Sequence, residues 1–383
     1  MSFELSEKIL KYLEESYSET IELLEALCKI PAPSNHEEKR AEFCKNWLEQ
    51  NGAEGVIIDD ALNVVYPLNC DEKDDIVVFM AHTDTVFPDM TYPIPYHRDE
   101  KYIYSPGVGD DTICLVMMLM IIKYIVKNNL TPHCGVLFVA NSCEEGLGNL
   151  KGVKKIMSDY EGRINRVYTF DAQYHGIICK CVGSHRYKIS VETEGGHSFS
   201  DFGNLNAISV AAELIHNLNQ CVLPKENDSR TTYNVGTIEG GTSVNTIAQN
   251  AAFMYEYRSD SYACIEKMKQ FFENEIKNIQ ACYDAKISVE TVGIRPCGNN
   301  VDEKLLDEIT QRAIDICQKH SGLTCTKRSG STDANIPMSL GIPAVCVGTY
   351  QGGGAHTREE YIEISSIPVG LKIVAELILE YFN

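Results

Sequence analysis

The segment 76–84, Ile-Val-Val-Phe-Met-Ala-His-Thr-Asp, joins an unbroken apolar run to a histidine and an aspartate. An apolar run of this length, without polar alternation, is typical of a strand buried on both faces of a parallel sheet. Three further runs share the pattern and are separated by helical stretches, at residues 136–140, 167–170 and 344–347. The sequence therefore predicts an α/β fold with a mostly parallel central sheet and flanking helices. One of these helices is expected at residues 36–51, with Ser34 as its N-cap.

Acidic or histidine residues follow each of these predicted strands. They are His82 and Asp84 after the first, Glu144 and Glu145 after the second, Asp171 after the third, and His356 beyond a glycine-rich loop after the fourth. Ligands of open α/β sheets bind beyond the carboxyl ends of the strands. We therefore expect these side chains to converge on one functional site at that edge.

Several of these residues are of the types that bind Zn²⁺ through nitrogen and oxygen. The candidate metal ligands are His82, Asp110, Glu145, Asp171 and His356. Two divalent ions held close together need a bridging carboxylate. The charges of two such ions balance three carboxylates and one hydroxide, whereas one ion would leave the site anionic. We expect two Zn²⁺ per chain, with Co²⁺ or Mn²⁺ as alternatives because all three suit such ligands.

Glu144 is adjacent to Glu145, so a carboxylate base lies beside the candidate ligands. Such a base takes a proton from metal-activated water and delivers it to a leaving amine. Asp84 lies two residues after His82 and, on an extended segment, on the same side, where it is expected to accept the second imidazole N–H. The turn 107–111, Gly-Val-Gly-Asp-Asp, lacks the third glycine of a dinucleotide-binding motif, which argues against a nucleotide cofactor.

The pattern changes between residues 182 and 295, where predicted strands and amphipathic helices follow the order β-α-β-β-α-β. This order is the signature of a ferredoxin-like α+β domain. The sequence therefore predicts a catalytic domain of residues 1–181 and 296–383, interrupted by an inserted domain of residues 182–295.

The composition limits the classes of partner. The formal net charge of −20 repels phosphate backbones and anionic membranes, so neither nucleic acid nor a membrane is an expected partner. The longest apolar run, residues 113–122, is about half of the ~20 residues that cross a bilayer. The N-terminal segment lacks the basic start and apolar stretch of a secretory signal, so we expect a cytoplasmic protein.

Ordered motifs extend through nearly the whole chain. They are Ile30-Pro-Ala-Pro-Ser34-x-x-Glu37, His82-Thr-Asp84-Thr-Val, Gly109-Asp110-Asp111, Glu144-Glu145-Gly-Leu-Gly148, Phe170-Asp171, Gly196-His197-Ser198, Gly240-Gly241-Thr-Ser-Val-Asn245, Gly330-Ser-Thr-Asp333-Ala-Asn335 and Ala355-His356-Thr-Arg-Glu359-Glu360. This set resembles the co-catalytic zinc exopeptidase and deacylase family, which includes peptidase T, glutamate carboxypeptidase, acetylornithine deacetylase and aminoacylase.

The resemblance implies a role for each candidate ligand. His82 and Asp171 would bind one zinc ion. Glu145 and His356 would bind the other, and Asp110 would bridge the two. Asp111 remains an alternative bridge, because here Thr-Ile follows the two aspartates where many members have Lys-Gly after the bridging residue.

The resemblance also implies roles in the inserted domain, which would serve as a dimerisation and lid domain. In family dimers the histidine matching His197 reaches the partner's active site and stabilises the tetrahedral oxyanion. Arg258 resembles the arginine that receives a substrate carboxylate, a task that suits the planar guanidinium. Asn245 is a further implied substrate contact. A homodimer is therefore expected.

The expected activity is hydrolysis of an amide bond in small peptides with a free carboxylate, by a di- or tripeptidase or a carboxypeptidase-like exopeptidase. Glu144 is the expected general base for water activated by two metal ions. An N-acyl-amino-acid deacylase is the close alternative, since it shares every motif, although the aspartate at position 171 favours the peptidase branch. A catalytically silent metal- or peptide-binding relative is a distant alternative, because Glu144 and all five ligands are present.

Overall fold

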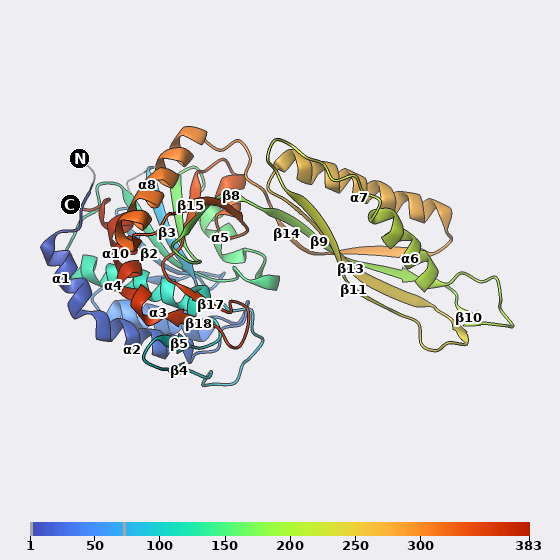
Figure 1. Ribbon diagram of the computed structural model, residues 1–383, viewed down its shortest axis with the longest axis horizontal. Helices are drawn as coiled ribbons and strands as arrows, with labels where there is room; N and C mark the ends of the chain where they lie inside the picture. The colour runs from blue at the N-terminus through green and yellow to red at the C-terminus, as the bar shows by residue number, and fades with distance from the viewer. Residues whose placement is uncertain (1–2, 72–73) are drawn as a thin grey trace. The chain divides into compact units, whose positions relative to one another are not determined.

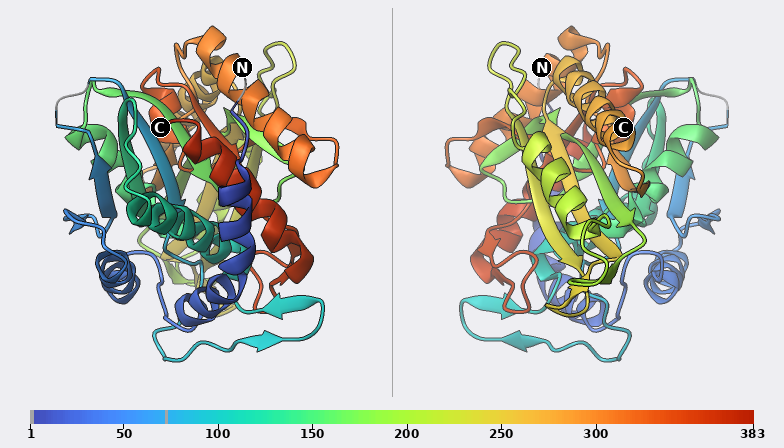
Figure 2. Two further views of the ribbon diagram at one scale, coloured as in Figure 1. Left: turned by 90° about the vertical axis from the view of Figure 1, so that its left-hand side faces the viewer. Right: turned by 90° about the vertical axis from the view of Figure 1, so that its right-hand side faces the viewer.

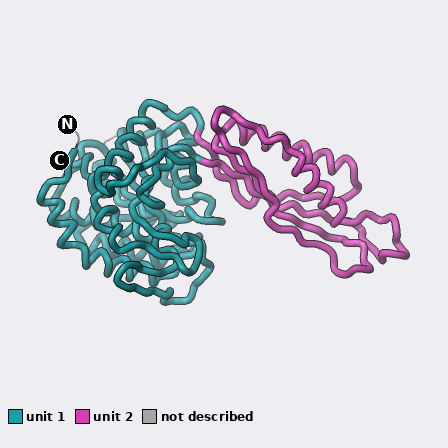
Figure 3. The backbone as a smooth tube through the Cα atoms, viewed as in Figure 1, with its two compact units in different colours: residues 1–181, 299–383 teal, residues 182–298 magenta. Residues whose placement is uncertain are grey.

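The computed structural model describes residues 3–71 and 74–383 (Figure 1). Residues 1–2 and 72–73, which belong to the first segment of the predicted catalytic domain, lie outside the described part. The chain divides into two compact units (Figure 3). Unit 1 comprises Met1–Cys181 and Asn299–Asn383, and unit 2 comprises Val182–Gly298. Among the described residues, no helix has the length and apolar character that crossing a membrane requires.

Unit 1 is built on an eight-stranded sheet with a parallel centre. The strand order is β1 (Ile57–Ile58), β2 (Val64–Leu68), β6 (Gly135–Asn141), β3 (Ile76–His82), β7 (Ile164–Phe170), β16 (Ala344–Val347), β8 (Gly176–Cys181) and β15 (Thr326–Gly330). Strand β3 pairs in parallel with β6 and β7, and β16 pairs in parallel with β7. The carboxyl ends of these four strands therefore share one edge of the sheet.

The unbroken apolar run in β3 is explained by two separate cores, one on each face of the sheet. Every residue of β3 is buried. Val77 and Phe79 belong to the core formed with helices α2 (Tyr17–Cys28), α4 (Ile113–Lys127), α8 (Glu303–Ser321) and α10 (Ile367–Leu379). Val78 and Met80 belong to the core formed with α5 (Lys151–Asp159) and α9 (Asn335–Ser339). The α/β class predicted from the sequence is confirmed.

Unit 2 contains an antiparallel sheet covered by two helices. The strand order is β11 (Thr231–Gly240), β13 (Asn250–Ser259), β9 (Gly183–Glu192) and β14 (Lys286–Arg295). Helices α6 (Ala207–Leu218) and α7 (Tyr262–Cys282) pack side by side on the sheet (Figure 2, right). Chain order and sheet order together give the predicted ferredoxin-like arrangement.

One predicted helix begins later than expected. The sequence predicts a helix from residue 36 with Ser34 as its N-cap, but α3 (Glu38–Gln50) begins at Glu38 and has Glu37 as its N-cap residue without a side-chain capping bond. The predicted helix is present, but its predicted N-cap is wrong, because the Ser34 hydroxyl instead donates a 2.6 Å hydrogen bond to Asp84. A tertiary contact has replaced the local one.

Helix α1 (Glu7–Glu15) and several short strands have no prediction from the sequence. The strands are the pair β10 (Gly196–His197) and β12 (Thr246–Ile247), and a small antiparallel sheet in the order β17 (Gly352–Gly353), β18 (Tyr361–Glu363), β5 (Tyr102–Tyr104) and β4 (His97–Arg98). Strands of two or three residues are too short to show a hydrophobic period.

Helices α8 and α10 of unit 1 are joined by a buried carboxylate. Glu376 on α10 is fully buried and accepts hydrogen bonds from Arg312, Lys319 and His320 on α8, at 3.2, 3.0 and 2.7 Å. Burial alone would raise the pKa of Glu376, but its hydrogen bonds to His320 and Lys319 outweigh this and hold the pKa below its ordinary value.

Glu376→Gln is expected to reduce the free energy of unfolding at pH 7 by about 3 kcal/mol, because it breaks a buried ionic network. A carboxylate with a lowered pKa stabilises the fold above its ordinary pKa, about 4.3, and this stabilisation disappears as the pH falls through the folded-state pKa. Melting temperatures of the wild type and of Glu376→Gln, measured between pH 7 and pH 3.5, test this. The difference should be largest at pH 7; a difference independent of pH would show that the ionised carboxylate of Glu376 does not stabilise the fold.

Candidate metal centre

Three parallel strands bring candidate residues to one edge of the sheet in unit 1. His82 is the last residue of β3, Asp171 follows β7, and Glu144 and Glu145 lie shortly after β6. Each segment leaves a strand whose partners fix its register, so the ends of the three strands set the positions of these side chains. The convergence expected from the strand ends is present in the structure.

Two further residues reach this edge from loops. Asp110 lies in a turn before α4 that begins at Gly107, whose φ of 72° suits glycine. A Cβ on the neighbouring Gly109 would come within 2.7 Å of the Tyr350 ring, so the turn packs too closely for a side chain there. His356 follows β17 in the glycine-rich loop.

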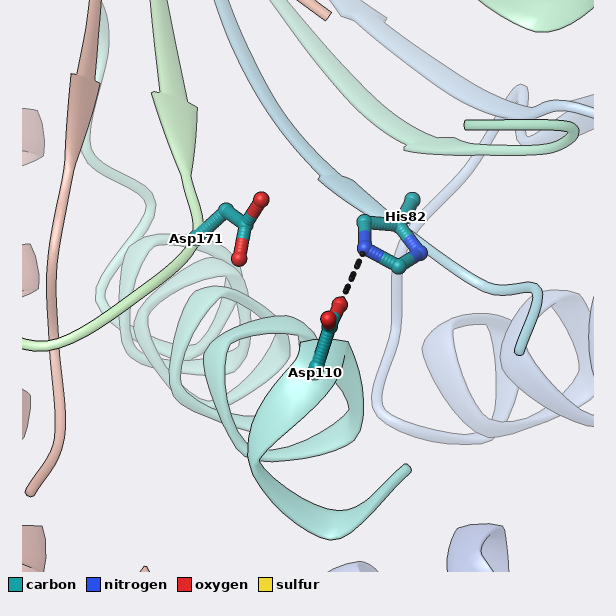
Figure 4. Close-up of side chains that lie close together, drawn as sticks. All are labelled: His82, Asp110 and Asp171. Carbon is teal, nitrogen blue, oxygen red and sulfur yellow. Dashed lines mark hydrogen bonds and ion pairs between the residues drawn. The ribbon is translucent and has the colours of Figure 1, made fainter. Parts of the chain in front are cut away.

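Asp110 contacts both histidines of the centre. Its Oδ1 lies 3.0 Å from His82 Nε2, and its Oδ2 lies 3.0 Å from His356 Nε2. The same His356 nitrogen lies 3.2 Å from Glu145 Oε1. Figure 4 shows the side chains of His82, Asp110 and Asp171 pointing toward one another.

The donor atoms fall into compact groups, within each of which all lie within 4.8 Å of one another. The groups are His82 with Asp110 and Asp171, Asp110 with Glu145 and His356, and His82 with Glu144 and Glu145. Asp110 is common to the first two. By contrast, Asp111 is fully buried and its Oδ2 accepts a hydrogen bond from the His82 main-chain N–H at 2.9 Å.

Asp84 organises the segment that carries the two glutamates. It is fully buried, and its two carboxylate oxygens accept the main-chain N–H groups of Glu144 and Glu145, each at 2.9 Å. His82 Nδ1 lies 3.1 Å from the Asp84 main-chain oxygen and 3.4 Å from its Oδ1. Asp84 therefore does more than the sequence predicts, since it orients both the histidine and the glutamate pair.

The electrostatics of the centre show an excess of negative charge. Burial, followed by the charge of Asp110, raises the pKa of Asp171 to about 7, and the same two causes raise the pKa of Glu145. Hydrogen bonds to Asp110 and Glu145 raise the pKa of His356 to about 11. The crowding of the carboxylates therefore favours the protonated forms of Asp171 and Glu145 and of the neighbouring His356. A donor set of two imidazoles and several buried carboxylates fits divalent cations such as Zn²⁺, which would relieve this repulsion.

The three remaining candidate residues lie in unit 2. His197, in β10, is exposed, and its Nδ1 accepts the main-chain N–H groups of Phe199 and Ser200, each at 3.3 Å. The neutral ring therefore carries its proton on Nε2. Asn245 is exposed, and its main-chain oxygen accepts the N–H of Ser198 at 3.0 Å.

Arg258, in β13, is partly exposed and pairs with Glu256 on the same strand, with donor–acceptor distances of 2.9 and 3.0 Å. This pair uses the Nε and Nη2 side of the guanidinium. The Nη1 side of the fork points away from that bond, so the pairing leaves donors that a second carboxylate could bind.

The comparisons with known proteins identify the family. The model of peptidase family M20/M25/M40 matches residues 78–380, so the chain belongs to this family of metal-dependent peptide hydrolases. The family resemblance inferred from the sequence is confirmed.

Individual relatives cover nearly the whole chain. An uncharacterised protein of Bacillus subtilis, YqjE, is 25% identical, with 92% of this chain and 96% of the relative covered. A succinyl-diaminopimelate desuccinylase of Corynebacterium glutamicum is 22% identical, with 91% and 92% covered. A crystal structure of a Staphylococcus aureus tripeptidase has a TM-score of 0.76 at 22% identity, covering 94% of this chain and 97% of that chain, and shares the fold.

Proposed function

We propose that this chain is a two-metal exopeptidase that cleaves an amide bond in small peptides with a free carboxylate. The contact of Asp110 with both His82 and His356 is the observation that carries the proposal, because a carboxylate that bridges two ions must face both sets of ligands. His82 and Asp171 would hold one ion, and Glu145 and His356 the other. Asp110 rather than Asp111 is the proposed bridge.

Glu144 is the proposed general base. When bound, the two ions supply Lewis acidity and make water acidic enough to lose a proton near neutral pH. Glu144 is 5% exposed, and the Asp84 carboxylate holds its main chain. Its carboxylate receives the proton from the attacking water and transfers it to the leaving amine. Asp84 keeps the His82 ring and the Glu144 segment in place throughout.

The roles that the family resemblance implies for unit 2 remain part of the proposal. In a homodimer, His197 would donate a hydrogen bond from Nε2 to the oxyanion that forms on the substrate in the partner chain's active site. The tautomer inferred from the Nδ1 contacts of His197 supports this role. Asn245 would contact the substrate. The mass of the protein in solution, measured by light scattering, tests the dimer, and a monomer would count against His197 acting on a partner.

Arg258→Ala is expected to raise KM by about 10- to 100-fold with a smaller change in kcat, because a charge-assisted hydrogen bond contributes about 1.5–3 kcal/mol to binding. The matched control is Arg186→Ala, since Arg186 also lies near Glu256, at 3.4 Å. Steady-state kinetics on one peptide measure both constants. An unchanged KM would show that Arg258 does not bind the substrate carboxylate.

A panel of dipeptides, tripeptides and N-acetyl amino acids, incubated with Zn²⁺- or Co²⁺-loaded protein, tests the proposed reaction. We expect hydrolysis of free peptides. Hydrolysis of the acyl amino acids alone would instead establish the deacylase alternative, to which the similarity to a desuccinylase lends some support. Full metal content without hydrolysis of any compound would establish a catalytically silent relative. The cytoplasmic location expected from the sequence remains a prediction that cell fractionation tests.

A further inference from the structure

The turn that carries Asp110 is hydrogen-bonded to a buried carboxylate that lies far away in the sequence. Glu360 is 1% exposed and lies directly before β18. Its Oε2 accepts the N–H of Gly107 at 2.7 Å, and its Oε1 accepts the N–H groups of Gly109 and Asp110 at 2.9 and 2.8 Å. One side chain thus satisfies three main-chain donors of one turn.

These main-chain donors lie outside the regular hydrogen bonding of the neighbouring helix. Helix α4 begins at Ile113, so the N–H groups of residues 107–110 precede its hydrogen-bond ladder. Gly107 and Gly109 are buried, and a buried N–H group without an acceptor is unfavourable. The conformation of the turn, and with it the direction of the Asp110 side chain, therefore depends on an acceptor at this position.

Glu360 is itself held firmly. Its main-chain oxygen accepts the N–H of Ser105 at 3.1 Å, and the next residue, Tyr361, pairs with Tyr104 in the small antiparallel sheet. Glu360 also lies four residues after His356. A single segment therefore provides one candidate ligand, His356, and fixes the turn that provides another.

The pattern of donors requires a carboxylate. Three N–H groups point at two oxygens, and a glutamate side chain offers an acceptor on both of these atoms, whereas a glutamine offers one. A glutamine side chain has the same shape as glutamate but carries an NH₂ donor in place of one oxygen. In the variant this NH₂ group would face a main-chain N–H, and two donors cannot hydrogen-bond to each other. Glu360→Gln therefore changes the hydrogen bonding of the turn with little change in packing.

We propose that Glu360 is a positioning residue that orients Asp110 for metal binding through the main chain of residues 107–110. The inference rests on the proposed function in one respect, namely that Asp110 bridges two ions. Glu360 is not itself a proposed ligand of the ions or of the substrate. Its effect is to preorganise the bridging carboxylate, as the hydrogen-bond partners of ligands do in other metal sites.

The test compares metal binding by metal-free wild type and Glu360→Gln in titrations with Co²⁺, followed by calorimetry and by the visible absorption of the bound ion. We expect the affinity of the variant to fall by about 10- to 100-fold and its cobalt spectrum to change. Glu376→Gln is the matched control, because it also neutralises a buried glutamate of unit 1 that fixes neighbouring segments. The control should lose thermal stability but keep the wild-type affinity and spectrum.

Wild-type affinity and spectrum in folded Glu360→Gln would overturn the proposal, as would an equal loss of affinity in Glu376→Gln. If Glu360→Gln does not fold, Glu360→Asp replaces it, since the shorter side chain keeps the charge but cannot reach all three donors and should also weaken binding. The proposed function fails separately: wild-type protein that binds two ions but hydrolyses no peptide would refute the reaction, while the cobalt titrations would still decide the role of Glu360.

Discussion

Glu144→Ala is expected to lower kcat by about 10³- to 10⁴-fold on any peptide that the wild type hydrolyses, because the variant lacks the group that receives the proton of the attacking water. The loss should appear in kcat and leave KM nearly unchanged, since Glu144 is not a proposed substrate ligand. Metal content should stay at the wild-type value, because the five proposed ligands remain. Steady-state kinetics and elemental analysis of the same preparation measure these quantities.

Glu359→Ala is the matched control for this experiment. Glu359 is an exposed acid close in sequence to His356, and its loss should change kcat by less than a factor of about two if general surface charge is unimportant at this site. Loss of metal in Glu144→Ala would contradict the assignment. Glu144 would then be a metal ligand and not the base. The donor group of His82, Glu144 and Glu145 makes this a real alternative, because Glu144 is close enough to the other two residues to bind the same ion.

Asp110→Asn is expected to weaken the binding of both metal ions by at least about 100-fold, a loss at the upper end of that seen for partners of metal ligands. The amide has one oxygen where a bridging carboxylate needs two, and it removes the negative charge between the proposed ions. Asp171→Asn should affect one ion only. Calorimetric titration of the metal-free variants with Zn²⁺ measures both affinities.

Asp111→Asn completes this comparison. Asp111 would be the bridge under the alternative assignment, and then its variant rather than Asp110→Asn would lose both ions. The contact of Asp111 Oδ2 with the His82 main chain predicts a smaller effect, since the side-chain amide oxygen of the variant would still accept that N–H. Loss of both ions in Asp111→Asn alone would therefore transfer the bridging role to Asp111.

The parts of the fold that could be predicted are those governed by burial. The apolar runs at 76–80, 136–140, 167–170 and 344–347 lie in β3, β6, β7 and β16, because strands covered on both faces are apolar at nearly every position. The convergence of His82, Glu145 and Asp171 then follows from the geometry of parallel strands. No long-range information was needed for either prediction.

The parts that could not be predicted depend on contacts between distant residues. The position of Ser34 in the sequence is typical of a helix cap, but in the structure its hydroxyl donates a hydrogen bond to Asp84, fifty residues away. Glu360 stands in a motif of the sequence, but its three donors lie 250 or more residues earlier. Local patterns give elements and their order, whereas such pairings depend on the folded chain.

The proposal of a two-metal peptidase is tested by a titration of metal-free protein with Zn²⁺ in which bound metal and hydrolysis of a tripeptide are measured together. We expect two ions to bind per chain and hydrolysis to appear as they bind. Saturation at one ion, or two bound ions without hydrolysis of any peptide in the panel, would contradict the proposal.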